Sequence, residues 1–141
     1  MDHTLASISD DLVKKYRSFK LCNAKGSSAI ISKIDPKSRQ FEIEQEIKDL
    51  CIDDLPNEIA LNEPRFILIS YELHHDDGRV SYPYCLIFSS PRVSPPDLKM
   101  MYAGSLHHFI DSSQVTKVLE LHDVEDLSEE WLRAEMKKKG F

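Results

Sequence analysis

Apolar residues near the N-terminus recur at the spacing of an amphipathic helix. Ser9 precedes them as an N-cap residue, and two aspartates follow it at the positive end of the predicted helix. The residues that share one apolar face are Leu12, Val13, Tyr16 and Phe19. The pattern therefore predicts a helix that begins after Ser9 and packs this face on the protein.

Strand patterns follow. Residues 29–34 and 39–44 flank a turn at 35–38, which predicts a hairpin with one solvated face. In residues 65–73 both alternating sets of positions are largely apolar, so we expect a central strand covered by helices on both sides.

A second hairpin is predicted at residues 74–79, where Asp77-Gly78 favours a tight turn. Residues 80–88 return as a largely apolar strand. Pro83 has no backbone N–H, so we expect a bulge or a missing ladder bond at that position.

The remaining elements are helical, apart from a short strand at 116–121. We expect a short helix at 53–59, a long helix that opens at residues 94–97, and a last helix capped by Ser128. The long helix should bury one face, formed by Leu98, Met101, Tyr102, Ser105 and Phe109. Mixed strands and helices without an internal repeat predict a mixed α/β fold in one domain, residues 1–141.

Composition narrows the class of protein. The formal net charge is −6 and the chain has no basic stripe, which argues against nucleic acid as a partner. No apolar run is long enough to span a bilayer, and no export signal is visible, so no membrane partner is expected. The three widely spaced cysteines fit reduced thiols in a cytosolic protein.

Residues with catalytic or metal-binding chemistry are present without a matching motif. The histidine pairs His74-His75 and His107-His108 lie near aspartates, but adjacent residues on a strand point to opposite faces and no metal-site spacing is met. The chain has four glycines and no phosphate-binding loop. We therefore predict no enzyme activity, no cofactor and no metal, and keep a small hydrolase or metal-dependent enzyme as the alternative from another class.

Four blocks of sequence, in order along the chain, resemble the glia maturation factor family. They are residues 75–83 (HDDGRVSYP), 87–91 (IFSSP), 100–105 (MMYAGS) and 129–133 (EEWLR). The resemblance extends over essentially the whole chain and implies the actin-depolymerising-factor homology fold, a central mixed sheet flanked by helices on both faces.

The resemblance also implies a function. Family members act on the branch-nucleating actin-related-protein complex (Arp2/3 complex), inhibit nucleation and sever the daughter filament at the junction, and bind bare actin weakly or not at all. The alternative within the same fold is a cofilin-like factor that binds actin monomers and filaments. The resemblance further implies a monomer in the cytoplasm, at cortical actin structures such as actin patches, and in the nucleus.

By resemblance, the long helix docks in the groove of an actin-related subunit, with the extended N-terminus beside it. The residues expected at this contact are Thr4, Asp97, Lys99, Met100, Ala103, Gly104 and His107. The helical spacing places the six of these residues that belong to the long helix on or beside its outward side, and a flexible methionine suits an apolar groove. In cofilin relatives a hydroxyl residue of the N-terminus controls docking through phosphorylation, since added negative charge disfavours docking. The resemblance therefore implies Thr4 or Ser7 as the phosphorylation site.

A second surface is expected at the tip of the hairpin. There the resemblance implies contact with the first actin subunit of the daughter filament, through His75, Asp76, Asp77 and Arg79. Asp97 stands where the long helix of cofilins typically begins with a basic residue. Together with the acidic hairpin tip, this difference argues against binding to bare filaments.

Overall fold

The computed structural model describes residues 6–21 and 25–140 and contains a five-stranded mixed sheet with the order β2-β1-β3-β6-β7. The first four strands in this order pair antiparallel, and β6 and β7 are parallel. The strands are β1 (Ser28–Asp35), β2 (Gln40–Ile47), β3 (Arg65–Ser70), β6 (Tyr84–Ser89) and β7 (Val118–Leu121).

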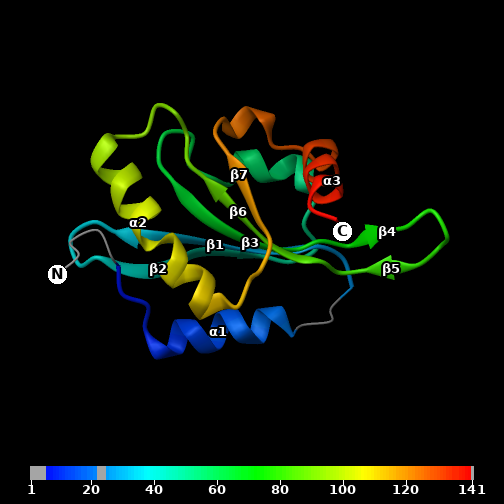
Figure 1. Cartoon of the computed structure of the whole chain (residues 1–141), viewed down its shortest axis with the longest axis horizontal. Helices are drawn as coiled ribbons and strands as arrows, with labels where there is room; N and C mark the ends of the chain where they lie inside the picture. Colours follow the sequence, from blue (N-terminus) through cyan, green and yellow to red (C-terminus); the bar gives the residue numbers. More distant parts are fainter. Residues whose placement is uncertain (1–5, 22–24, 141) are drawn as a thin grey trace.

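Helices cover both faces of the sheet, as predicted. One buried cluster joins the sheet to α3 (Glu129–Lys138) and the short 3-10 helices η1 (Ile52–Asn57) and η2 (Val124–Asp126). The other joins it to α1 (Asp10–Lys20) and α2 (Pro96–Ser113). Figure 1 shows α1 and α3 on opposite sides of the strands.

The predicted helix starts are confirmed by their caps. The Ser9 hydroxyl accepts a hydrogen bond from the Leu12 N–H at 3.2 Å, and the Ser128 hydroxyl accepts one from the Trp131 N–H at 3.0 Å. Caps of this kind satisfy backbone donors that have no partner inside the helix, which is why they can be predicted from local sequence.

The predicted strand 65–73 is wrong in its extent. The central strand β3 is fully buried but ends at Ser70, and the chain resumes only as the short strand β4 (Leu73–His74). The break has a tertiary cause. The Glu72 N–H donates to the Ser27 hydroxyl at 2.9 Å, while the Glu72 carboxylate accepts a hydrogen bond from the Gly26 N–H.

The strand predicted at 80–88 is also divided, at the place where Pro83 predicted a missing ladder bond. Strand β5 (Val80–Ser81) pairs with β4, and β6 begins only at Tyr84. The paired strands β4 and β5 project from the sheet as a hairpin (Figure 1).

Buried titratable groups predict how the stability of this fold changes at high pH. Burial raises the pKa of the Cys85 thiol from 9.0 to about 12, and that of the Tyr16 phenol from 10.0 to about 12. The folded protein therefore holds protons that the unfolded chain releases, so this stabilisation is complete below pH 9.0 and is lost as the pH rises toward about 12.

Urea unfolding at a series of alkaline pH values should show a free energy of unfolding that is constant below about pH 9 and falls above it. A Cys85→Ala variant should show a shallower fall, because one of the contributing groups is gone. A free energy of unfolding that stays constant far above pH 9.0 would contradict the prediction.

Candidate partner-binding surfaces

Helix α2 is held on the sheet by polar contacts on its buried side. The Tyr102 hydroxyl accepts a hydrogen bond from the Ile34 N–H at 2.9 Å, and the Ser105 hydroxyl accepts one from the Ala6 N–H at 2.9 Å. Tyr102, Ser105 and Phe109 are buried, as the helical spacing predicted. These contacts fix which side of α2 faces outward.

The outward side of α2 carries most of the residues predicted for docking. The exposed ones are Asp97, Met100, Ala103, Gly104 and His107, here called the docking face. Met100 has an exposed fraction of 63%, which is high for a large apolar side chain. Beside it lies a groove of about 530 Å³ that Arg39 and Pro95 also line.

Lys99 differs from the other predicted docking residues. It is only half-buried, and its ammonium group donates a hydrogen bond to the Arg92 carbonyl at 2.8 Å. The side chain therefore stabilises the loop between β6 and α2 in the conformation described.

Ala6 and Ser7 lie between α2 and the turn that joins β1 and β2. In addition to the bond from Ala6 to α2, the Ser7 N–H donates to the Arg39 carbonyl and the Ser7 carbonyl accepts from the Phe41 N–H, both at 2.9 Å. The Ser7 side chain is exposed. Thr4 lies outside the described residues.

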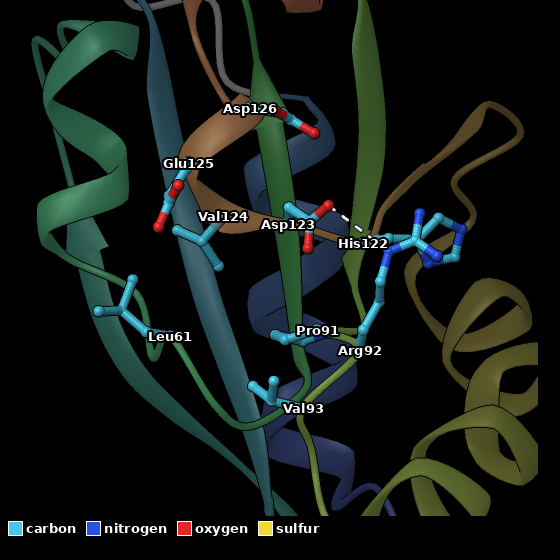
Figure 2. A pocket seen from close by; sticks show the side chains of 9 residues that line it. All are labelled: Leu61, Pro91, Arg92, Val93, His122, Asp123, Val124, Glu125 and Asp126. Carbon is cyan, nitrogen blue, oxygen red and sulfur yellow. Dashed lines mark ion pairs between the residues drawn. The ribbon is translucent and has the colours of Figure 1, made fainter.

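A pocket of about 270 Å³ adjoins the start of α2 (Figure 2). Arg92 and Asp123 form an ion pair across 3.5 Å, while Val93 and Leu61 expose 74% and 65% of their surface. In Figure 2 the carboxylates of Asp123, Glu125 and Asp126 lie on the opposite side of the pocket from Val93.

No role was predicted for these residues from the sequence. The pocket brings together three segments that are distant in the sequence, so local patterns do not predict it. Within one segment, the only indication was Val93, an apolar residue in an otherwise polar turn.

The hairpin tip, residues 75–79, is organised by hydrogen bonds among the residues predicted there. The His75 N–H donates to the Arg79 carbonyl at 2.8 Å, and the Arg79 guanidinium donates to the Asp77 carboxylate at 2.6 Å. The Arg79 backbone N–H and then its side chain lower the pKa of Asp77. Asp76 is exposed, and no ion pair within the described part of the chain involves it.

The base of the hairpin and helix α3 border a groove of about 400 Å³. Arg133 and Lys137 of α3 line it together with His74, His75 and Asp76. No binding site was predicted at Lys137 from the sequence. The sequence did contain an indication of this groove, because Arg133 and Lys137 are four residues apart and therefore lie on the same face of α3.

The two predicted surfaces lie far apart. Figure 1 shows the hairpin projecting at one end of the molecule and the start of α2 near the other end.

The described part of the chain has neither a cluster of metal-binding side chains nor a membrane-spanning helix. Within residues 6–21 and 25–140, no group of three His, Cys, Asp or Glu side chains is arranged to hold a metal ion. None of the helices in those same ranges is both long and apolar enough to cross a bilayer.

Comparison with known proteins identifies the family. Residues 5–137 match the family model described as cofilin/tropomyosin-type actin-binding protein. Human glia maturation factor beta is 44% identical over 137 residues, which are 97% of this chain and 94% of that protein. The Drosophila melanogaster glia maturation factor is 32% identical over 136 residues, 96% of this chain and 99% of that protein.

A solved structure agrees with the sequence comparison. The solution structure of glia maturation factor from Caenorhabditis elegans superposes with a TM-score of 0.79 at 34% identity, covering 92% of this chain and 94% of that one. The family is one of actin regulators and not of enzymes. The chain therefore belongs to the glia maturation factor family of actin-regulatory proteins, which have the cofilin-like actin-depolymerising-factor homology fold.

Proposed function

We propose that this protein binds the Arp2/3 complex, inhibits nucleation of branched actin and promotes removal of existing branches. The observation that carries the proposal is the exposed stripe on α2, where Met100 stands beside the small residues Ala103 and Gly104 in a member of the glia maturation factor family. Small residues let a partner approach the helix closely, and methionine adapts to an apolar groove.

The docking face would enter the groove of an actin-related subunit. The exposed apolar side chains of Val93 and Leu61 line the pocket that adjoins the start of α2, where charged residues such as Asp123 also line it. Burial of Met100 and Val93 together would provide the apolar centre that protein interfaces typically require. Lys99 is proposed to support this surface indirectly, by fixing the loop that carries Arg92 and Val93.

The hairpin tip would provide a second contact, with the first actin subunit of the daughter filament. Its distance from α2 suits a protein that acts at a junction between two chains of subunits. Asp76, together with Arg133 and Lys137 in the adjoining groove, offers charged groups for that contact. An Asp76→Lys variant should shorten branch lifetime less than wild type does, while binding to isolated Arp2/3 complex is retained.

Branch lifetime separates this proposal from the cofilin-like alternative. Purified protein should shorten the lifetime of individual branches followed by fluorescence microscopy and should not sediment with bare actin filaments. The acidic Asp97 at the start of α2 and the acidic hairpin tip favour this result, because both differ from the pattern that the resemblance implies for filament-binding cofilins. Cosedimentation with bare filaments, combined with unchanged branches, would favour the alternative.

Ser7 is proposed as a regulatory phosphorylation site. Its exposed side chain lies on a segment that contacts both α2 and the β1–β2 turn, so a phosphate would add negative charge beside the docking face. A Ser7→Glu variant in the branch assay should require more protein for the same effect. An unchanged concentration dependence would remove Ser7 from the proposal.

The protein is proposed to act as a monomer in the cytoplasm, at cortical actin structures such as actin patches, and also in the nucleus. A fluorescent fusion should colocalise with branched actin at the cell cortex. A distribution that does not follow branched actin would contradict this proposal.

A further inference from the structure

A cluster of positive charge lies on α1 and the nearby strand ends, in a chain with a net charge of −6. Its exposed members are Lys14, Lys15, Arg17, Lys20, Lys25 and Lys48, here called the basic face. Lys15 pairs with Glu46 at 3.2 Å, and Lys20 donates to the Gln114 carbonyl at 3.3 Å. No ion pair within residues 6–21 and 25–140 involves any of the other four.

An apolar pocket of about 200 Å³ opens beside this basic face. The apolar residues that line it are Ala29 and Ile30, which are buried, and Phe19 and Ile47, which are half-buried. Ligand pockets for small molecules usually have volumes of about 300–1,000 Å³, so this one is better suited to a single large side chain.

The rim of the pocket is charged. Lys25 and Lys48 line it together with Glu46 and Asp49. The Glu46 carboxylate is already paired with Lys15, so Asp49 is the one carboxylate on this rim that has no cation within ion-pair distance in the described structure. The balance of charge around the pocket is therefore positive, which favours an acidic partner.

The orientation of α1 distinguishes between two kinds of acidic partner. A helix that binds a lipid surface turns its apolar face outward, into the interface. Here Leu12, Tyr16 and Phe19 pack against the sheet, and the exposed side of α1 is cationic. An apolar pocket whose charged rim has a positive balance favours a peptide, whose apolar side chain enters the pocket while its carboxylates contact the lysines.

We propose that the basic face and this pocket together bind an acidic peptide segment that carries one large apolar side chain. The site lies at the end of α1, next to the C-terminal end of α2, where Lys20 contacts Gln114. Met100 lies near the opposite end of α2, so the proposed site is separate from the docking face and does not depend on the proposed function.

The experiment uses a short synthetic peptide of aspartate and glutamate with one central leucine. Titration into isotopically labelled protein should shift the backbone amide signals of residues 25–30 and 46–49. A peptide with alanine in place of leucine should bind at least about fivefold more weakly, since burial of a leucine side chain contributes to affinity.

Reversing the charge of Lys25 and Lys48 tests whether these lysines contribute to peptide binding. A Lys25→Glu, Lys48→Glu double variant should bind the leucine peptide about tenfold or more weakly. The matched control is Lys138→Glu, Lys139→Glu, which changes the net charge equally at two exposed positions at the end of α3 and should leave the affinity unchanged. Circular dichroism checks that all variants are folded.

Three results would overturn the proposal. The first is equal affinity for the leucine and alanine peptides, and the second is amide shifts confined to other parts of the molecule. The third is binding to vesicles of anionic lipid without binding to the peptide, which would assign the basic face to membranes. Because the Lys25→Glu, Lys48→Glu variant should still shorten branch lifetime, failure here is distinguishable from failure of the proposed function.

Discussion

Replacing Phe109 by alanine should lower the free energy of unfolding by about 3–5 kcal/mol, the largest loss expected from a single substitution in this chain. Phe109 is fully buried, and its ring lies 4.7 Å from that of Phe66, 5.1 Å from Tyr16 and 5.4 Å from Phe41. The substitution removes contacts to α1, β2 and β3 at once and leaves a cavity that these elements fill only in part.

Urea unfolding monitored by circular dichroism measures this loss. Small domains are stable by about 5–15 kcal/mol, so the variant should retain a folded state with a much lower denaturation midpoint. Val93→Ala is the control, because Val93 is 74% exposed and its loss should change stability by about 0.5 kcal/mol or less. A loss below about 1.5 kcal/mol for Phe109→Ala would mean that the cluster repacks around the gap.

The second large effect concerns binding. A Met100→Asp variant should need about thirtyfold more protein to shorten branch lifetime, because residues at the centre of an interface typically contribute about 2 kcal/mol or more. Met100 is 63% exposed and makes no core contact that folding requires, so the stability of the variant should be close to wild type. The added carboxylate near Asp97 would have to be desolvated in an apolar groove.

Ser18→Asp is the matched control for this variant. It introduces the same charge at an exposed position of α1, away from the docking face, and should leave branch lifetime at the wild-type value. If Met100→Asp is folded and acts like wild type, α2 is not the helix that docks, and the proposed binding mode fails even though the family assignment stands.

Helix α2 shows which side-chain orientations can be predicted from local sequence spacing and which cannot. The three- and four-residue spacing predicted that Tyr102, Ser105 and Phe109 face inward, which the structure confirms. The same spacing placed Met100 on the outward side of the helix, and its side chain is exposed. Spacing alone does not indicate that the Lys99 ammonium turns toward the Arg92 carbonyl, because that contact depends on the path of the preceding loop.

Arg65 is a buried charged residue whose partners could not be predicted from the sequence. From sequence it opens a central strand, where an arginine has no obvious partner. In the structure it is 6% exposed and its guanidinium donates to the Glu44 carboxylate at 3.1 Å and the Glu63 carboxylate at 3.2 Å. Glu44 comes from a strand that is separated from β3 in the sheet by β1, so only the strand order brings the ion pair together.

The sequence by itself determined the helix caps, the turns and the apolar faces, because each depends on residues within a few positions of one another. It also carried the resemblance on which the family assignment was first based. The tertiary structure alone decided the division of the strand after Ser70, the pocket beside α2 and the recess next to the basic face. Each of these depends on contacts between segments that are far apart in the chain, and such contacts form only when the whole fold is in place.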